Sequence, residues 1–185
     1  MRAFLAITLP DDVRESLASL SKRLRKSGAK ASWVKPANFH LTLRFLGDVD
    51  DQSLEGLRDV LRAQYSGCGP LRMSVEGVGV FPNIRRPGVV WAGMAALEGD
   101  LPLVQRYAED AARAIGLPPE KKAFHPHVTL ARVRDHRRLG TLRDALEQAR
   151  DYVGGEVAAG HVSLFSSELR RDGAVYRVIE EFPLE

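Results

Sequence analysis

A doubled motif constrains this chain more than any other feature of its sequence. The stretch FHLTLRFLG recurs later in similar form as FHPHVTLAR. Each copy contains the pattern His-x-Thr-x, with apolar residues in the x places. In an extended strand, residues two apart share a face, so His40 and Thr42 should point one way while the leucines point into a core. His127 and Thr129 repeat this arrangement. The sequence therefore predicts two half-buried strands with matching polar faces.

Two such strands facing each other across a cleft would bring two imidazoles and two hydroxyls around one ligand. Imidazole is the side chain whose unperturbed pKa lies near neutrality, so one histidine can hold a proton while the other lacks it. One general acid, one general base and two hydroxyl donors suit cleavage of a phosphodiester. A single histidine on a strand is more often structural, but two in matched contexts, each followed by threonine, favour a catalytic pair. We therefore interpret the histidines and threonines of both motifs as candidate site residues.

The rest of the chain alternates between helix-like and strand-like segments. Helical spacing of apolar residues predicts helices, whereas alternation or short apolar runs bounded by glycine and proline predict strands. The expected helices run from Asp11 to a stop at Gly28, from a Ser53 cap to Gly67, from Asp100 to Gly116, and from Leu142 to Ala149. The expected strands lie at residues 2–9, 32–34, 40–47, 71–79 with a bulge at its glycines, 89–94, around His127, 160–165, and 174–182 after a turn at Asp172-Gly173.

The order of strand, helix, motif strand, helix and hairpin occurs twice, slightly permuted. We therefore expect an α+β fold of two lobes related by a pseudo-twofold axis, with the active-site cleft between them. Each lobe should be an antiparallel sheet with helices outside. No linker rich in glycine and serine divides the chain, so we expect residues 1–185 to form one bilobal domain.

Arginine-rich clusters indicate an anionic ligand. The 185-residue chain has a formal net charge of +3, and 28% of its residues are charged. Arginine binds phosphate through a bidentate fork. The clusters lie at residues 21–26, 85–86, 132–138 and 170–171. A solvated surface explains any single cluster, but together they make an anionic ligand plausible. The density of charge is below that of a duplex-binding module.

The apolar start of the chain is too short for a signal peptide or a membrane span, because Asp11, Asp12 and Arg14 interrupt it. We therefore expect a cytoplasmic protein. Cys68 is the single cysteine, which excludes a disulfide framework and a cysteine-rich metal site. We expect this residue to be a quiet thiol rather than a nucleophile.

Further motifs accompany the doubled pattern. Trp33-Val34 leads through a Pro-x-Asn turn to the first motif, Phe-Leu-Gly follows that motif, and His-Pro-His opens the second. Near the end of the chain, Ser-x-Leu is followed by Gly-x-x-Tyr. In these motifs the chain resembles the 2H phosphoesterases, and more narrowly the bacterial and archaeal RNA 2′,3′-cyclic phosphodiesterases, formerly called 2′-5′ RNA ligases. The resemblance covers nearly the whole chain.

The resemblance implies hydrolysis of a terminal 2′,3′-cyclic phosphate on RNA to a 2′-phosphomonoester, without a metal or another cofactor. By that analogy His40 would protonate the departing 3′ oxygen, and His127 would activate the attacking water. Thr42 and Thr129 would donate hydrogen bonds to the non-bridging phosphate oxygens, where charge develops. The implied partner is an RNA end, and we expect a monomer with no obligate protein partner and no membrane association.

Two arginines near the motifs are further candidates for contacting the substrate. Arg132 matches the substrate-binding arginine that follows the second motif in this family. Its place five residues after His127 predicts that it faces away, unless the strand twists or ends. Arg44 is an even number of residues from His40 and Thr42, so alternation along the strand predicts that it shares a face with them. We keep both arginines as expected substrate-binding residues.

Three alternatives stay open. His125 and His127 lie on one face of a strand and would suit a metal pair, but no cysteine or third histidine lies nearby in the sequence, so we expect no metal. The substrate could instead be a small cyclic nucleotide or a 2′-5′ linkage, with ligation as the reverse reaction. A protein of another class, an RNA-binding module without catalysis, is disfavoured by the retention of both histidines and both threonines.

Overall fold

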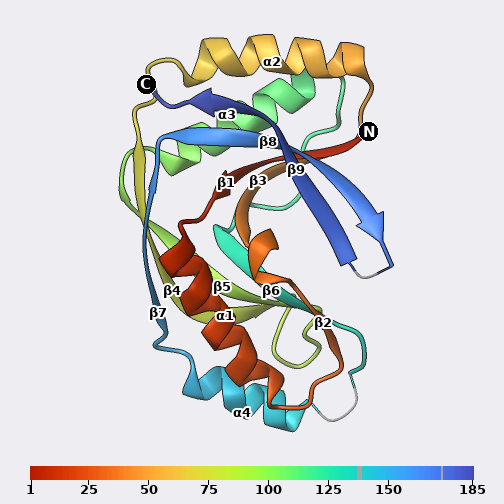
Figure 1. Cartoon of the computed structure of the whole chain (residues 1–185), viewed down its shortest axis with the longest axis vertical. Coiled ribbons are helices and arrows are strands. Elements are labelled where there is room, and N and C mark those ends of the chain that lie inside the picture. The colour runs from red at the N-terminus through yellow and green to blue at the C-terminus, as the bar shows by residue number, and fades with distance from the viewer. Residues whose placement is uncertain (137–138, 172) are drawn as a thin grey trace.

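The computed structural model describes residues 1–136, 139–171 and 173–185. The helices are α1 (Asp11–Arg25), α2 (Asp51–Tyr65), α3 (Leu101–Ala114), α4 (Gly140–Gln148) and the short 3-10 helix η1 (Pro36–Asn38) (Figure 1). The strands are β1 (Arg2–Thr8), β2 (Ala31–Trp33), β3 (His40–Asp48), β4 (Leu71–Phe81), β5 (Val89–Glu98), β6 (His127–Val133), β7 (Val153–Ala159), β8 (His161–Arg170) and β9 (Gly173–Pro183). Arg137 and Arg138 of the basic cluster at residues 132–138 lie outside the described residues, and so does Asp172 of the expected turn.

The strands form an antiparallel sheet in the order β7-β4-β5-β6-β3-β1-β8-β9, with β2 paired to β6. In the middle of this sheet, β3 and β6 are joined through a single residue pair, Leu41 with Val128. The sheet therefore divides at this junction into two halves, one containing β1, β3, β8 and β9 and the other containing β2 and β4 to β7. This division confirms the expected α+β fold of two antiparallel lobes.

Each lobe carries its own pair of helices. Helix α2 packs against α3 and β9, and α3 packs against β3, whereas α1 packs against β7 and α4. The two helix pairs lie at opposite ends of the molecule (Figure 1). The lobes consequently do not follow the two halves of the sequence. Helix α1, from the beginning of the chain, belongs to the lobe of β4 to β7, while α3 belongs to the lobe of β3.

Helices α2 and α3 begin where acidic side chains cap them. Asp50 accepts a hydrogen bond of 2.8 Å from the backbone N–H of Ser53, so α2 begins earlier than expected and the predicted Ser53 cap is wrong. Asp100 caps α3 in the same way through the N–H of Leu103, at 2.9 Å. In both cases the carboxylate satisfies a backbone donor that has no partner within the helix.

The expected hairpin of β4 and β5 is confirmed, and so is its bulge. The pairing register shifts between Glu76 and Val78, and the intervening Gly77 has a φ of 69°, a left-handed conformation that glycine adopts without steric cost. The N–H of Gly77 donates 2.7 Å to the carbonyl of Tyr152. The bulge thereby connects β4 to the beginning of β7, a strand that the sequence did not predict.

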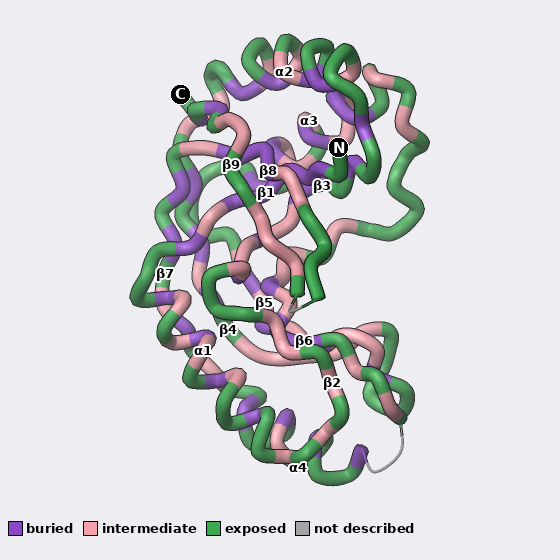
Figure 2. Tube along the Cα trace, turned by 45° about the vertical axis from the view of Figure 1, so that its right-hand side comes forward, coloured by how far each residue is buried: buried purple, intermediate pink, exposed green. Residues whose placement is uncertain are grey.

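Strand β1 is buried on both faces. Leu5 and Ile7 belong to the main hydrophobic core, whereas Phe4 and Ala6 form a second, small cluster with Phe165. Because side chains alternate along a strand, the second cluster lies on the opposite face of the sheet. The buried path of β1 through the molecule is visible in Figure 2. Among the described residues, no helix combines the length and apolarity that a membrane span requires.

Candidate active site

The two His-x-Thr motifs meet where the two lobes join. Leu41 and Val128 form the residue pair between β3 and β6, and both are fully buried. In an antiparallel pair the two strands continue in opposite directions from such a contact. The register therefore places the histidine of each motif on the side of the threonine of the other motif, about a pseudo-twofold axis through the junction.

Both motif strands contain a bulge directly after the threonine. The pairing of β3 with β1 skips Leu43, and the pairing of β6 with β5 skips Leu130. As a result Leu43 and Arg44 are both buried, and so are Leu130 and Ala131. A bulge of this kind reverses the alternation of side chains beyond it.

The bulges exchange the faces that simple alternation predicts for the two arginines. Arg132 lines the cavity beside the motifs, although alternation alone predicts that it faces away. Arg44 is buried on the other face, so the prediction that it shares a face with His40 and Thr42 is wrong. Phe45 lies at the place in β3 that Arg132 has in β6, is 56% exposed, and lines the cavity.

Arg44 instead joins β3 to α3 and to the segment that precedes the second motif. Its Nε lies 2.6 Å from Oε2 of Glu109, in α3. Its guanidinium also donates hydrogen bonds to the carbonyls of Pro118, at 2.6 Å, and Phe45, at 2.9 Å, and lies 3.8 Å from the carboxylate of Glu120. A buried guanidinium requires such partners, and these partners explain why Arg44 is turned away from the cavity.

Each motif histidine is held by the same local hydrogen bond. Nδ1 of His40 lies 2.7 Å from the carbonyl oxygen of Asn38, and Nδ1 of His127 lies 2.6 Å from the carbonyl oxygen of His125. A carbonyl can only accept, so Nδ1 carries the proton in both rings. The bond leaves Nε2 of each ring as the nitrogen that can exchange a proton with a ligand.

Burial lowers the pKa of both histidines. For His40 the hydrogen bond to Asn38 opposes this effect, and the positive charge of His127 lowers the pKa further. For His127 the bond to His125 opposes the effect of burial, and the charges of His125 and Arg132 add to it. The interaction of His127 with His40 agrees with the pairing of Leu41 and Val128, which places the two motifs side by side. An anion bound between them would raise both pKa values again.

Aromatic rings surround each imidazole. The ring centroid of His40 lies 4.8 Å from that of Phe4 and 5.4 Å from that of Tyr176, which it meets edge-on. The His127 ring lies 5.1 Å from Phe81, also edge-on, and 6.3 Å from Trp91. These contacts restrict the rotation of the rings and supply the burial that lowers their pKa.

A cavity of about 950 Å³ opens beside the junction. Its walls include His40, Thr42 and Thr129, while His127 is not among its lining residues. The cationic side chains that line it are Arg2, Lys35, Arg132, Arg134, Arg170 and Arg171. No aspartate or glutamate of the described chain lines this cavity. Such a one-signed lining creates a positive potential that favours an anionic ligand.

The tip of the β8–β9 hairpin forms one wall of this cavity. Leu169 and Gly173 line it together with the exposed ring of Phe45. The hairpin is held against η1 because the side-chain amide of Asn38 donates a 2.7 Å hydrogen bond to the carbonyl of Ala174. Asn38 therefore holds the hairpin with its side chain and His40 with its carbonyl.

The remaining sequence candidates lie outside this arrangement. His125 packs with its ring centroid 5.8 Å from that of Phe81, and the described residues contain no group of three or more side chains suited to hold a metal ion. Burial raises the pKa of the Cys68 thiol, which donates 3.5 Å to the carbonyl of Gln64. The thiol therefore has the character of a structural group.

Sequence reasoning did not single out Tyr176, whose ring lies beside His40 in the cavity wall. Burial raises its pKa, an effect that the charges of Arg132 and Arg2 partly offset. The Gly-x-x-Tyr motif contains this residue, but neither its spacing nor its composition indicates that it contacts the first motif. Lys35 and Arg134 also line the cavity, and only Arg134 belongs to a cluster that the sequence had marked as basic.

Comparison with known proteins places this architecture in a family. The chain matches the model of the LigT-like phosphoesterases over residues 7–91 and 95–176. A protein of Methanothermobacter thermautotrophicus named RNA 2′,3′-cyclic phosphodiesterase is 34% identical over 184 residues, which are 100% of this chain and 99% of that one. A protein of the same name from Aquifex aeolicus is 32% identical over 186 residues, with coverages of 100% and 97%.

Solved structures agree with this assignment. A crystal structure from Thermus thermophilus matches with a TM-score of 0.79 at 28% identity, covering 100% of this chain and 98% of that one. Escherichia coli LigT in complex with 3′-AMP has a TM-score of 0.78 at 23% identity, with coverages of 99% and 97%, and supports the fold alone. The chain belongs to the LigT-like phosphoesterase family, which confirms the resemblance to the 2H phosphoesterases.

Proposed function

We propose that this protein hydrolyses the terminal 2′,3′-cyclic phosphate of RNA to a 2′-phosphomonoester without a metal ion. The observation that carries the proposal is the junction at Leu41 and Val128, where two identically anchored His-x-Thr motifs adjoin a cationic cavity. The names of the relatives support the same reaction. The size and charge of the cavity favour an RNA end over a small cyclic nucleotide.

In the proposed mechanism the two histidines transfer protons in opposite directions. Nε2 of His127 accepts a proton from water as the water oxygen attacks phosphorus. Nε2 of His40 donates a proton to the 3′ oxygen as the bond between phosphorus and that oxygen breaks. The hydroxyls of Thr42 and Thr129 donate to the non-bridging oxygens, where negative charge increases in the transition state, and the cationic lining of the cavity holds the RNA backbone.

The first prediction concerns pH. Activity requires one protonated and one neutral histidine, so kcat/KM should follow a bell-shaped profile centred on the mean of the two pKa values of the pair. Because burial lowers both pKa values in the free protein, we expect this optimum below about pH 6.5. Bound phosphate raises both pKa values, so the optimum of kcat should lie at higher pH. Rate profiles at limiting and saturating RNA test this, and a flat profile would contradict paired acid–base catalysis.

The second prediction concerns the threonines. Replacing Thr42 or Thr129 by valine keeps the shape of the side chain and removes the hydroxyl donor. We expect kcat to fall by about ten- to a hundredfold in each variant, the effect of one lost hydrogen bond to a charged oxygen. Thr141→Val is the matched control, because that hydroxyl donates to the carbonyl of Ser27 and Thr141 does not line the catalytic cavity. If the Thr42→Val variant keeps the wild-type kcat, the Thr42 hydroxyl does not stabilise the transition state.

The activity itself is tested with chelator-treated protein and a short RNA that ends in a 2′,3′-cyclic phosphate, resolving 2′- from 3′-phosphate products. The proposal expects the 2′-phosphate, formed at the same rate with and without chelator. Rate loss on chelation that added metal restores would overturn the metal-independent mechanism. RNA binding without any ring opening would favour the catalytically inert binding module instead.

A further inference from the structure

Within the described residues, four of the six cationic side chains that line the catalytic cavity gather at one end of it. Lys35 comes two residues after β2, Arg134 directly follows β6, and Arg170 and Arg171 belong to the tip of the β8–β9 hairpin. This tip lies beside β2 and β6 in both Figure 1 and Figure 2, and it is held there by contacts between β9 and η1. We call this end of the cavity, defined by these four side chains, the cationic exit. An RNA strand that leaves the cavity here keeps its phosphates close to positive charge.

Arg134 is held at the cavity wall through both its backbone and its side chain. Its N–H donates a hydrogen bond of 2.8 Å to the carbonyl of Lys30, which extends the pairing of β6 with β2 beyond the end of β6. Its Nε donates a second bond of 2.8 Å to the hydroxyl of Ser32, in β2. Ser32 pairs with Arg132 across the two strands, and Arg132 and Arg134 are two residues apart, so all three side chains lie on the face that lines the cavity.

The bond to Ser32 leaves the outer end of the guanidinium of Arg134 open to a ligand. Nε is occupied, whereas the two terminal nitrogens make no hydrogen bond or ion pair within the described residues. Two parallel N–H groups of this kind match two oxygens of one phosphate. Because Ser32 already fixes the orientation of the side chain, less conformational entropy is lost when an anion binds.

The spacing along β6 suits the backbone of a single strand. The proposed mechanism places Thr129 against the cyclic phosphate, and Thr129, Arg132 and Arg134 all line the cavity. Arg134 comes five positions after Thr129, and the bulge takes up one of them, so about 13 Å of strand separates the two residues. This is about the length that two nucleotides of an extended RNA strand cover. Arg134 therefore lies within reach of a phosphate upstream of the cyclic end.

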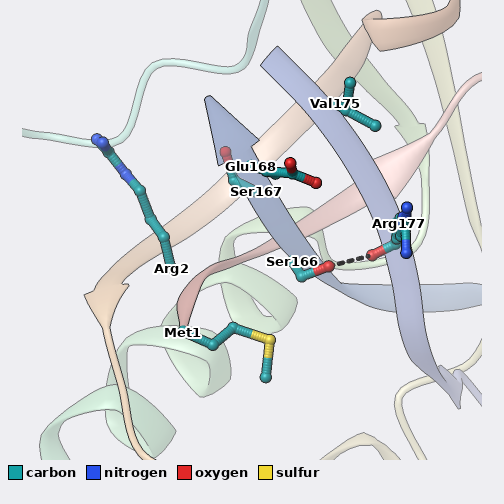
Figure 3. A pocket seen from close by; sticks show the side chains of 7 residues that line it. All are labelled: Met1, Arg2, Ser166, Ser167, Glu168, Val175 and Arg177. Atoms are coloured by element: carbon teal, nitrogen blue, oxygen red, sulfur yellow. Dashed lines mark hydrogen bonds between the residues drawn. The ribbon is translucent and has the colours of Figure 1, made fainter. Parts of the chain in front are cut away.

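The opposite face of the hairpin offers no such path. The register pairs Ser166 with Arg177 and Glu168 with Val175, and the residues between them line the cavity. These four side chains consequently point away from the cavity, around a separate hollow of about 260 Å³. Figure 3 shows the carboxylate of Glu168 in this hollow and the Arg2 side chain directed away from Arg177. Because a carboxylate repels phosphate, Arg177 lies off the path of the RNA.

From these observations we propose that Arg134, positioned by Ser32, binds a phosphodiester one or two nucleotides upstream of the cyclic end of the RNA. The inference rests on the proposed function, because it takes the cyclic phosphate to lie at Thr42 and Thr129. It adds the direction of the strand, which runs from the junction along β6 and leaves through the cationic exit. Contacts to the backbone carry no sequence information, so the protein should prefer longer RNA without preferring particular bases at these positions.

The test compares substrates of two lengths. For the wild type, Arg134→Ala and the control Arg177→Ala, kcat/KM is measured on a 2′,3′-cyclic mononucleotide and on a trinucleotide with the same cyclic end. We expect Arg134→Ala to lower the ratio of trinucleotide to mononucleotide about three- to fivefold, the effect of one exposed ion pair. The salt dependence of its trinucleotide value should also become shallower by about 0.7 in log–log slope. Arg177→Ala removes an equal charge from the opposite face of the hairpin and should leave the ratio unchanged.

Ser32→Ala tests the orientation of the guanidinium. This variant keeps the charge of Arg134 and removes the acceptor of its Nε. The ratio should therefore fall less than in Arg134→Ala, while the salt dependence stays that of the wild type. Adding Ser32→Ala to Arg134→Ala should lower the ratio no further, because the hydroxyl acts through the guanidinium. A further loss in the double variant would contradict this positioning role.

Two outcomes would overturn the inference while leaving the proposed function intact. In one, the wild type opens both substrates with equal kcat/KM. In the other, Arg134→Ala keeps the wild-type ratio. If the wild type opens neither substrate, the proposed function fails, and fluorescence anisotropy of a labelled trinucleotide then decides the phosphate contact alone. Weaker binding in Arg134→Ala than in Arg177→Ala would support the contact, and equal binding would overturn it.

Discussion

Replacing His40 or His127 by alanine should lower the turnover of RNA with a cyclic phosphate end by about 10² to 10⁴ in either variant, the range for loss of a proton-transfer group. Both rings are anchored through Nδ1 to a backbone carbonyl, so each presents one nitrogen for this purpose. Because the two act on the same transition state, the double variant should be far less impaired than the product of the single effects predicts. Single-turnover rates at saturating RNA measure this directly.

His161→Ala is the matched control for the histidine variants. His161 lies in β8, is partly exposed, and pairs with Glu181 at 3.2 Å; it does not line the catalytic cavity. We expect this variant to keep wild-type turnover. RNA binding, followed by anisotropy, should survive in His40→Ala and His127→Ala. A variant that keeps both binding and most of the wild-type rate would exclude its histidine from proton transfer.

Replacing Arg44 by alanine should reduce the free energy of unfolding by about 3 kcal/mol or more, the effect of breaking a buried ion pair from one side. The Arg44 side chain is 9% exposed and that of its partner Glu109 is 17% exposed. Its loss leaves the Glu109 carboxylate without its nearest cation, and the carbonyl of Pro118 without the donor at 2.6 Å. Urea denaturation followed by circular dichroism measures the change.

Arg62→Ala is the comparison for this experiment, because Arg62 pairs with Glu180 while its side chain is 57% exposed. An exposed pair of this kind contributes about 0–1 kcal/mol. Replacing both members of the buried pair, as in Arg44→Met with Glu109→Leu, should recover much of the stability, since no buried charge then lacks a partner. Equal losses in Arg44→Ala and Arg62→Ala would show that Arg44 contributes no more than a surface contact.

The doubled His-x-Thr pattern could be read from the sequence because its argument covers only two residues. Residues two apart in a strand share a face unless a bulge falls between them. In both motifs the bulge comes after the threonine, at Leu43 and Leu130. The prediction that each histidine shares a face with the threonine of its own motif was therefore correct. The faces that alternation predicted for residues after the threonine were wrong.

The two arginines show where such reasoning ends. Arg44 lies two residues beyond Thr42, and Arg132 three residues beyond Thr129, so both positions depend on bulges that are defined by the neighbouring strands. Arg44 is also drawn to the helix side by Glu109, a residue 65 positions away in α3. A contact over that distance leaves no periodic signal near Arg44.

The assignment of elements to lobes has the same character. The existence of the helices and strands follows from local periodicity. Their assignment to a lobe does not, because α1 packs beside β7 and α3 packs beside β3, and each of these contacts joins segments far apart in the sequence. Strand β7 was missed because Gly154 and Gly155 lower its local strand propensity. It is a strand because β4 pairs with it along its length, from Leu71 opposite Ala159 to Glu76 opposite Val153.

The sequence by itself determined the family, the α+β class, and the shared face of each histidine with its own threonine, because motif composition and short-range periodicity are properties of the chain. Only the tertiary structure decided that the motifs meet at Leu41 and Val128, that Arg132 and not Arg44 lines the cavity, and that the ring of Tyr176 lies beside His40. Each of these three features depends on strand pairing and burial between segments far apart in sequence. The free energy that stabilises them comes from long-range contacts, which do not affect the local periodicity of the sequence.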